Sequence, residues 1–311
     1  MPLFSVIIPL YNKEKHLKNT LLSVLDQTYP DFEILVVNDG STDRSMDILH
    51  QFNDSRIVII EQTNQGVSSA RNHGIEKASG KLIAFLDADD YWFSNHLEVM
   101  AALYFDFPQA GMYCSRYKIK LAKNNLYSPN PTNIKPDFRG MVPDFFHSSL
   151  VDRVAWTSIV VIPKPVLQSV GGFTTTVSNG QDLELWIKVA VKHPVAISNT
   201  VTAHYHFEIA DSLAKRNILK KKLMDFGQFA EAEKKNPSLK KFLDIYRIEY
   251  ALHYHMFGDD SKMSYYLKDT DRHNIAFKTK ILLLLPGFIL RLLLKLKHLL
   301  KKIGINFTIY H

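Results

Sequence analysis

The chain has 311 residues, of which 46% are hydrophobic and 22% charged, with a single cysteine. This composition fits a globular protein of one large or two smaller domains, and excludes a disordered, collagen-like or disulfide-stapled chain. The formal net charge of +7 equals the seven Lys and Arg residues between His273 and His311, a segment without Asp or Glu. The rest of the chain is neutral, which argues against a general nucleic-acid-binding surface.

The first hundred residues alternate between apolar runs, which predict strands, and segments with helical spacing. We expect strands at 4–10, 32–37, 57–60 and 82–86, and helices at 15–25, 46–52 and 68–78. Ser41-Thr42-Asp43 is expected to cap the second helix. This alternation predicts an α/β fold whose mostly parallel sheet carries helices on both faces. The first ten residues form a strand and are too short for a secretory signal, so we expect a cytoplasmic protein.

After about residue 106 the alternation of predicted strands and helices becomes less regular. We expect strands at 113–121 and 158–162, an irregular loop at 124–137, a helix at 183–192, and helices over 211–270 with breaks at 236–237 and 258–260. Cys114 suits a buried strand position. The predicted domains are 1–210, with halves 1–105 and 106–210, a helical extension at 211–272 and a basic amphipathic segment at 273–311.

Polar side chains follow each of the first four predicted strands. They are Tyr11 and Asn12, then Asp39, then Asn64, and finally Asp87 and Asp89. Because the carboxyl ends of parallel strands meet at one edge of the sheet, where such sheets bind ligands, we expect these groups to lie close together. The positions therefore predict a binding site at this edge.

Asp87-Ala88-Asp89 suits a divalent cation that is shared with a diphosphate. Mg²⁺ and Mn²⁺ prefer hard oxygen ligands and often take one or two carboxylates plus substrate phosphates. Asp39 suits the imide of uracil or a ribose hydroxyl, Tyr11 suits a stacked base, and Arg71 suits a phosphate. The alternatives are a solvated loop for the aspartate pair, a turn residue for Asp39, a loop aromatic for Tyr11 and an exposed helix charge for Arg71.

Four motifs together resemble glycosyltransferase family 2. They are SVIIPLYN at 5–12, VVNDGSTD at 36–43, NQGVSSARNHGI at 64–75 and FLDADD at 85–90. The likeness is close over about 4–105 and continues thinly to about 210. It implies the GT-A fold, an inverting reaction, a nucleotide-sugar donor, and Mn²⁺ or Mg²⁺. By this likeness the nucleotide would be held by Pro9, Tyr11, Asp39, Arg71 and Asp87, and the metal by Asp89.

The second half resembles the family in Gly171-Gly172-Phe173 and in the segment 180–186. The resemblance implies that Asp182 is the general base, which takes the proton of the attacking hydroxyl. The chain departs from the family's pattern at Gln181, where Glu is more usual. Glu184 is the alternative base, and Asp182 also suits the N-cap of the following helix.

Two histidines alternate in the predicted strand near residue 205, His204 and His206. Related enzymes carry a histidine near here that approaches the metal, and the distance to Asp211-Ser212-Leu213 favours His206. A packed or surface histidine is the alternative. Trp156 and Trp186 suit either the acceptor pocket or the core.

The C-terminal segment 281–303 is predicted to form a basic amphipathic helix after Pro286-Gly287. Arg291, Lys295, His298 and Lys302 fall on one helical face and leucines on the other. Its apolar run is too short to cross a bilayer, which needs about 20 residues. It suits the surface of an anionic membrane, or docking on the protein itself.

The sequence thus predicts a metal-dependent hexosyltransferase, peripheral on the inner face of the cell membrane, with a UDP-sugar favoured over GDP- or dTDP-sugars. The acceptor would be a glycan or lipid-linked precursor of a cell-surface polysaccharide, and no nucleic acid is involved. The alternatives are a sugar nucleotidyltransferase or an inactive scaffold of the same fold. A nucleotidyltransferase would normally carry a Gly-rich basic loop after the first strand, which this sequence does not supply. An inactive scaffold conflicts with the presence of Asp87, Asp89 and Asp182.

Overall fold

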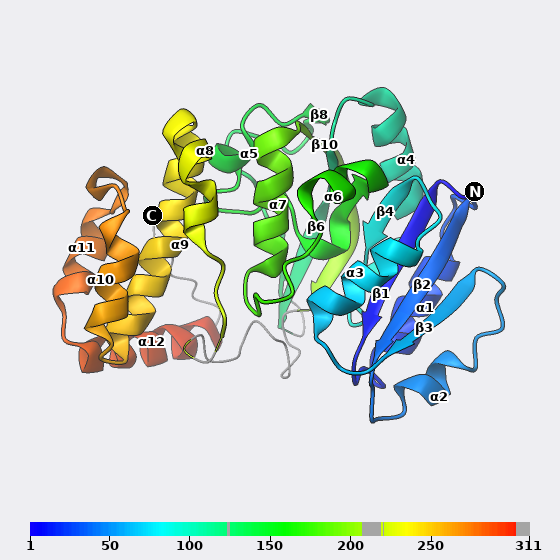
Figure 1. The fold of residues 1–311 in the computed structure, drawn as a ribbon, viewed down its shortest axis with the longest axis horizontal. Coiled ribbons are helices and arrows are strands. Elements are labelled where there is room, and N and C mark those ends of the chain that lie inside the picture. Colours follow the sequence, from blue (N-terminus) through cyan, green and yellow to red (C-terminus); the bar gives the residue numbers. More distant parts are fainter. Residues whose placement is uncertain (123–124, 207–218, 220, 303–311) are drawn as a thin grey trace. The chain divides into compact units, whose positions relative to one another are not determined.

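The computed structural model describes residues 1–122, 125–206, 219 and 221–302 (Figure 1). The chain folds into two compact units. Unit 1 consists mainly of Met1–Ser148 and Asp152–Arg216, and unit 2 mainly of Asp225–His311. Unit 1 combines a sheet with helices, whereas the described part of unit 2 is helical.

The described strands of unit 1 form one sheet in the order β3-β2-β1-β4-β9-β6-β10-β5, while β7 pairs with β6 and β8 with β10. The strands are β1 (Phe4–Leu10), β2 (Phe32–Asp39), β3 (Ile57–Gln62), β4 (Leu82–Phe85), β5 (Tyr91–Trp92), β6 (Met112–Ala122), β7 (Asn125–Tyr127), β8 (Gly140–Met141), β9 (Val160–Pro163) and β10 (Val195–His206). The first four in this order are parallel, as are β6 and β10, whereas β9 runs antiparallel to both its neighbours. This confirms the predicted α/β class with a mostly parallel sheet.

The helices of unit 1 pack on this sheet, with α3 across β1 and β2, and α4 against β6 and β10. They are α1 (Leu17–Leu25), α2 (Ser45–Leu49), α3 (Val67–Lys77), α4 (His96–Asp106), α5 (Phe145–Ser148), α6 (Lys164–Val170) and α7 (Gln181–Lys192), with a 3₁₀ turn, η1, at Thr157–Ile159.

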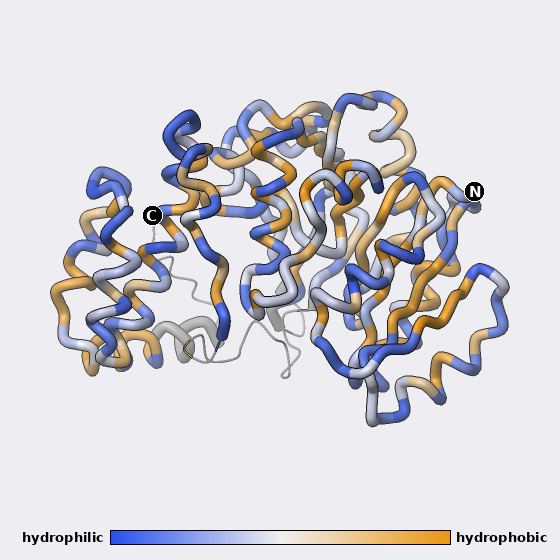
Figure 2. Tube along the Cα trace, viewed as in Figure 1, coloured by the Kyte–Doolittle hydropathy of each residue, from blue (hydrophilic) through white to orange (hydrophobic). Residues whose placement is uncertain are grey.

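The core of unit 1 is built on β1, β2 and β4, which stand out as apolar in Figure 2. Their nearly unbroken apolar runs are typical of strands that are covered on both faces. Gly74 lets α3 approach β1 closely, because a Cβ there would lie 2.6 Å from Ile7 Cγ2. Cys114 is buried in β6, as its strand context predicts, and burial raises the pKa of its thiol.

Three local predictions about the bounds or capping of elements were wrong. α2 ends at Leu49 and begins after Arg44, so Ser41-Thr42-Asp43 does not supply its N-cap, although Asp43 accepts from the N–H of Ser45 at 2.9 Å. The predicted loop at 124–137 contains β7 at its start. Ser158 lies in the 3₁₀ turn and not in a strand, because β9 begins at Val160.

Unit 2 contains the helices α8 (Ala230–Lys235), α9 (Pro237–Met256), α10 (Asp260–Lys268), α11 (Phe277–Leu284) and α12 (Gly287–Lys302). The breaks predicted at 236–237, 258–260 and 286–287 are confirmed. Leu290 of α12 packs against Ile248, Leu252 and Met256 of α9. Among the helices that the structure describes, none is both long and apolar enough to span a bilayer.

His96 is a fully buried histidine at the start of α4. Its Nδ1 lies 2.6 Å from Thr202 Oγ1, and its ring stacks on Trp92 with centroids 4.0 Å apart. Burial lowers the pKa of His96 to about 3. The folded protein therefore keeps this ring neutral at pH values at which the unfolded chain binds a proton.

We predict that His96 makes stability fall as the solution is acidified. The contribution is complete above about pH 6.5 and is lost as the pH drops toward 3, by about 1.4 kcal/mol per pH unit. The difference in unfolding free energy between wild type and His96→Gln should therefore shrink by about 2 to 3 kcal/mol from pH 6.5 to 4.5 in urea titrations. With His50→Gln, which replaces an exposed histidine, the difference should stay constant, and a constant difference for His96→Gln would contradict the prediction.

Candidate active site

The segments that follow β1 and β2 are tied together at the carboxyl edge of the sheet. Asn12 takes a φ of 53°, which asparagine tolerates better than most residues, and its side-chain oxygen accepts from the N–H of Thr42 at 2.8 Å. Pro9 lies within β1, and Tyr11 directly after it leaves 45% of its surface exposed. The Tyr11 ring is therefore open to a stacking ligand.

Asp39 ends β2 and is buried beneath the loop that leads into α3. Its Oδ1 accepts from Gln62 Nε2 and from the N–H of Gln65, both at 2.8 Å, and its Oδ2 accepts from the N–H of Gly66 at 2.9 Å. This carboxylate therefore fixes the β3–α3 loop. A carboxylate oxygen accepts two hydrogen bonds, so Oδ2 keeps capacity for one more donor.

The nearly buried Arg71 of α3 forms an ion pair with Asp87, which follows β4 and whose side chain is 30% exposed. Its Nη2 lies 2.5 Å from Asp87 Oδ1, and the guanidinium carbon stands 5.1 Å from the centre of the Phe173 ring. The Nε and Nη1 of Arg71 have no hydrogen-bond partner among the described residues. Buried donors without partners are costly, so these two nitrogens are polar groups that the described residues leave unsatisfied.

The Gly171-Gly172-Phe173 motif docks directly on α3. Asn72 accepts from the N–H of Phe173 at 2.9 Å and donates to its carbonyl at 2.8 Å. Gly172 has a φ of 65°, and a Cβ at this position would lie 2.8 Å from Asn72 Oδ1. Glycine is thus required twice over, by backbone conformation and by close approach.

Asp89 forms an ion pair with Lys13, whose Nζ lies 2.5 Å from Asp89 Oδ2. Among the residues that the structure describes, no three His, Cys, Asp or Glu side chains could close around an ion. Asp87 and Asp89 therefore offer at most a few hard oxygen ligands, and a diphosphate and water would have to supply the rest. This is the usual manner in which Mg²⁺ and Mn²⁺ bind to phosphate-transferring or phosphate-releasing sites.

Residues 87–90 form a turn after β4, closed by the N–H of Asp90 on the carbonyl of Asp87 at 2.9 Å, which we call the aspartate turn. Ser158 connects this turn to the 3₁₀ turn η1. Its hydroxyl donates to Asp90 Oδ2 at 2.5 Å and accepts from the N–H of Asp87 at 3.1 Å, while its carbonyl accepts from Trp92 Nε1. Burial, and then the charges of Asp87 and Asp89, raise the pKa of Asp90 well above its ordinary value. Asp90 thus favours its neutral form and acts as a buried anchor of the turn.

Asp182 contacts the 3₁₀ turn η1. It lies in the first turn of α7, where Thr157 Oγ1 donates to its Oδ2 at 3.3 Å and the N–H of Leu183 to its Oδ1 at 2.8 Å. The N-cap of α7 is Gly180 and not Asp182, so the capping alternative was wrong. Because Thr157 and Ser158 are adjacent, one dipeptide contacts both Asp182 and the aspartate turn.

Glu184 is a buried carboxylate that Lys188 and Thr174 already contact. Its Oε1 lies 2.6 Å from both Lys188 Nζ and Thr174 Oγ1, and the residue is 2% exposed. An acceptor sugar would have to reach a buried and paired carboxylate, which makes Glu184 less accessible than Asp182. The side-chain oxygen of Gln181, beside Asp182, is buried without a partner among the described residues.

The remaining predicted residues are placed as follows. His206 is the last residue of β10, and its side chain lies outside the described part, as do residues 211–213. Trp186 is buried against Phe85 and Phe173, which is a core position. Trp156 is partly buried, with its ring centre 5.0 Å from that of Tyr205.

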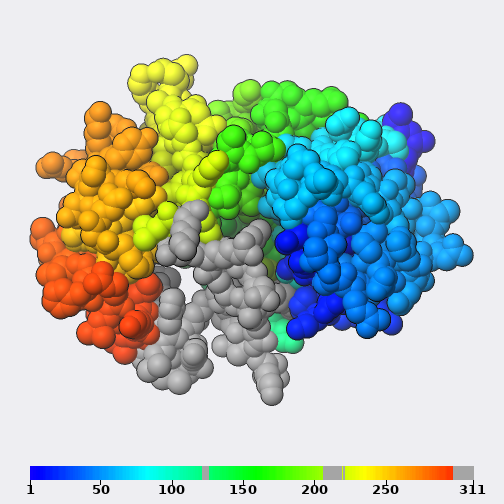
Figure 3. Space-filling view, turned by 60° about the horizontal axis from the view of Figure 1, so that its bottom comes forward, coloured from blue at the N-terminus to red at the C-terminus, as the bar shows by residue number. Residues whose placement is uncertain are grey.

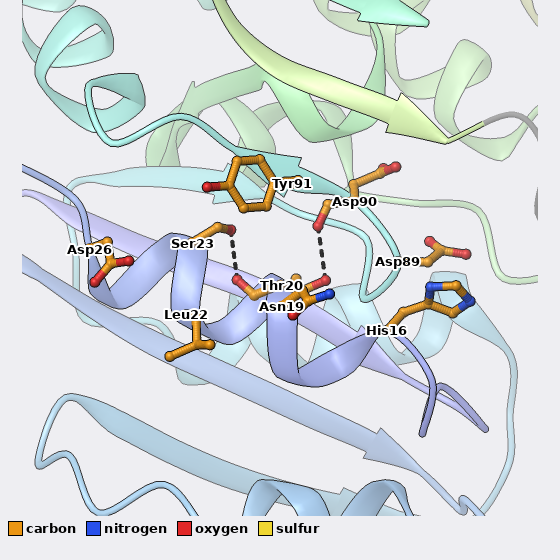
Figure 4. A pocket seen from close by; sticks show the side chains of 9 residues that line it. All are labelled: His16, Asn19, Thr20, Leu22, Ser23, Asp26, Asp89, Asp90 and Tyr91. Carbon is orange, nitrogen blue, oxygen red and sulfur yellow. Dashed lines mark hydrogen bonds between the residues drawn. The ribbon is translucent and has the colours of Figure 1, made fainter. Parts of the chain in front are cut away.

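A pocket of about 290 Å³ lies between α1 and the segment that follows β4 (Figure 4). It is lined by His16, Asn19, Thr20, Leu22, Ser23, Asp26, Asp89, Asp90 and Tyr91. Thr20 Oγ1 donates to the carbonyls of Ala88 and Asp90, at 3.0 and 2.8 Å, and so fixes the aspartate turn from below. Asp89 is the predicted site residue that borders this pocket.

The edge predicted from the sequence is therefore present, and hydrogen bonds or ion pairs join its parts. The roles assigned to the individual residues stay predictions. Sequence reasoning missed Lys13, Asn72 and the pair Thr157-Ser158. Lys13 directly follows a quoted motif, whereas Thr157 and Ser158 carry no local signal that separates them from other hydroxyl residues.

Residues 5–157 match the family model described as Glycosyl transferase family 2. The glycosyltransferase GlyA of Streptococcus pneumoniae is 36% identical over 153 residues, which make up 49% of this chain and 20% of that protein. TuaG of Bacillus subtilis, whose name refers to teichuronic acid biosynthesis, is 46% identical over 100 residues, or 31% of this chain and 40% of its own. This chain therefore spans less than half the length of these relatives.

The fold also resembles solved structures. Residues 1–349 of S. aureus TarS, crystallised in complex with UDP-GlcNAc, superpose with a TM-score of 0.62 and 17% identity over 85% of this chain and 90% of that chain. The same protein is also solved in complex with UDP. At this level of identity the likeness establishes a shared fold.

We predict that Ser158→Ala lowers the free energy of unfolding by about 1 to 3 kcal/mol, because it leaves the buried Asp90 carboxyl and the N–H of Asp87 without this partner. Urea denaturation followed by circular dichroism measures the change. Ser169→Ala removes a hydroxyl on the exposed side of α6 and should stay within about 0.5 kcal/mol of wild type. Equal stability of the two variants would show that the Ser158 contacts do not support the turn.

Proposed function

We propose that this chain is an inverting glycosyltransferase, because residues 5–157 match the family model described as Glycosyl transferase family 2. It would move a sugar from a nucleotide-diphosphate donor to an acceptor hydroxyl. The observation that carries the proposal is the joining of four elements at one sheet edge: the β2 end at Asp39, Arg71 of α3, the aspartate turn after β4, and Asp182 of α7.

The donor site would run along the ends of β1 and β2. Tyr11 offers an exposed ring for the base, and Asp39 Oδ2 keeps capacity for an N–H or hydroxyl donor. Two donors of Arg71 have no partner within the described part of the chain. UDP is the favoured nucleotide, because the imide N–H of uracil suits a carboxylate acceptor. The UDP and UDP-GlcNAc complexes of TarS support this choice.

A divalent cation, Mn²⁺ or Mg²⁺, would lie at the aspartate turn and neutralise charge on the leaving diphosphate. Asp89 would be its main protein ligand, with Asp87 as a further oxygen donor and His206 as a third candidate. Ser158 and Thr20 hold the turn from two sides and so keep Asp89 at the sheet edge.

In the transfer step, Asp182 would take the proton from the acceptor hydroxyl. The acceptor oxygen forms a bond to the anomeric carbon while the bond from that carbon to the diphosphate oxygen breaks. The bonding pair leaves with the nucleoside diphosphate, and attack from the opposite face inverts the configuration. Thr157 orients Asp182 for this role through its hydrogen bond.

We predict that UDP binds this chain in a metal-dependent manner, and that Asp89→Ala lowers the affinity measured with Mn²⁺ at least about tenfold, since it removes a direct ligand. Isothermal titration calorimetry with UDP, GDP and dTDP, with and without Mn²⁺, measures this. Asp47→Ala, which removes an exposed carboxylate on α2, is the control and should bind like wild type.

Asp182→Asn separates binding from chemistry. It should bind UDP like wild type but lower the release of UDP from a donor sugar by about 10² to 10⁴, because only the general base is removed. If no nucleotide binds in the presence of metal, or if Asp182→Asn retains full turnover, the proposed function fails.

We further propose that the acceptor belongs to a cell-surface polysaccharide precursor and that α11 and α12 contact an anionic bilayer. Leu284, Phe288 and Leu292 are at least 64% exposed, and Lys278, Lys280, Arg291 and Lys295 belong to the same helices. We call these seven residues the terminal surface. Figure 3 shows the surface of α11 and α12 in orange-red.

One side of α12 packs on α9 through Leu290, which supports docking of this helix on the protein, and the membrane contact would use its exposed residues. The buried side anchors the helix to unit 2, and the terminal surface presents apolar groups together with positive charge. Because no acidic residue occurs between 273 and 311, this charge complements anionic headgroups. Ile303 and the side chains of 297–302 lie outside the described part.

We predict that the protein sediments with vesicles that contain phosphatidylglycerol and not with pure phosphatidylcholine. Phe288→Glu should lower the partition coefficient at least about tenfold, because an exposed aromatic ring that would insert into the bilayer is replaced by a negative charge. Phe105→Glu is the matched control, since Phe105 of α4 is 63% exposed and Phe288 is 64% exposed. Equal loss in both variants, or no binding by the wild type, would contradict the membrane proposal.

A further inference from the structure

We infer that Lys13 is an internal counter-ion of Asp89, which a divalent cation must displace, and that the displaced ammonium then binds the diphosphate. The inference rests on the proposed metal and nucleotide binding and goes beyond it, because it assigns an order to these events. The cation would bind weakly alone and much better together with the nucleotide.

The backbone of Lys13 is fixed, whereas its charged end has room to move. The N–H of Lys13 donates to Ser45 Oγ at 2.8 Å, and the preceding Asn12 is tied to Thr42 and Asp43. The Lys13 and Asp89 side chains are 24% and 17% exposed, so solvent reaches the pair from one side. Only the four-carbon stem of Lys13 has to rotate to release Asp89.

The pair completes a local balance of charge. Asp87 is paired with Arg71 and Asp89 with Lys13, while the buried Asp90 carboxyl accepts from the Ser158 hydroxyl. A cation that approached Asp89 with Lys13 in place would meet an ammonium group at the same oxygen. Like charges at such a distance repel strongly in a partly shielded site, so cation binding requires the ammonium to leave.

The displaced ammonium needs a new anion, and a diphosphate at this sheet edge is the one that the proposed function supplies. Lysine binds phosphate as a flexible point charge with three donors. Binding of the metal and binding of the nucleotide therefore favour each other, because the metal displaces Lys13 from Asp89 and the diphosphate then binds the Lys13 ammonium. Linkage requires the two affinities to rise by the same factor.

Lys13→Met tests this, because methionine keeps much of the stem and removes the charge. Without nucleotide, the variant should bind Mn²⁺ at least about fivefold more tightly than wild type, measured by calorimetry or by the electron paramagnetic resonance signal of free Mn²⁺. With saturating UDP this advantage should disappear or reverse, so the coupling factor between Mn²⁺ and UDP falls. Lys13→Arg keeps the charge and should retain strong coupling.

Lys15→Met is the matched control. It removes the same positive charge from an exposed side chain that lies two residues from Lys13. It should leave the Mn²⁺ affinity of the nucleotide-free protein unchanged. Equal affinities of Lys13→Met and Lys15→Met, with both proteins folded by circular dichroism, overturn the inference. Weaker binding by Lys13→Met without nucleotide also overturns it.

Asp89→Ala distinguishes this failure from failure of the proposed function. If Mn²⁺ binding with UDP requires Asp89 but does not respond to Lys13→Met in the free protein, only the counter-ion inference falls. If Asp89→Ala binds Mn²⁺ like wild type, or if wild type binds none even with UDP, the proposed metal site falls and the inference falls with it.

Discussion

Three aspartates within four residues, at the end of a buried apolar strand, are the constraint on which the rest of unit 1 depends. Like charges so close together repel, and the structure gives each carboxyl a different partner: Arg71 for Asp87, Lys13 for Asp89 and Ser158 for Asp90. These partners come from α3, from the loop after β1 and from the 3₁₀ turn before β9. The aspartate turn thus holds these separate elements in register.

The same network explains how unit 1 can prepare a site before any ligand arrives. Thr20 fixes the turn through two carbonyls, Ser158 fixes it through an N–H and a carboxyl, and Thr157 extends the contact to Asp182. Most of these bonds are buried, where rearrangement is costly. Lys13 and Tyr11 are more exposed, so the groups that would meet a ligand are those that can move most freely.

The sequence was sufficient to predict the α/β class and the polar edge, because apolar runs followed by polar residues report strand ends directly. The bounds of β1 and the breaks before α9, α10 and α12 were predicted to within a residue or two. Ser158 and Asn72 escaped prediction since their partners lie 71 and 101 residues away. Periodicity along the chain carries no information about such contacts, and it did not reveal which leucines of α12 dock on α9.

The contact between Asn72 and Phe173 bears on how parts of this chain could be exchanged with those of relatives. Asn72 belongs to the half of unit 1 that was matched closely by motif, and Phe173 to the half in which the likeness is thin, yet each satisfies the other's polar groups and Gly172 leaves the required space. A chimera that joins the N-terminal part of this fold from one protein to the C-terminal part from another would keep this contact only if both of its sides come from the same protein. Recombination within the fold is thereby restricted at a point that neither half reveals by itself.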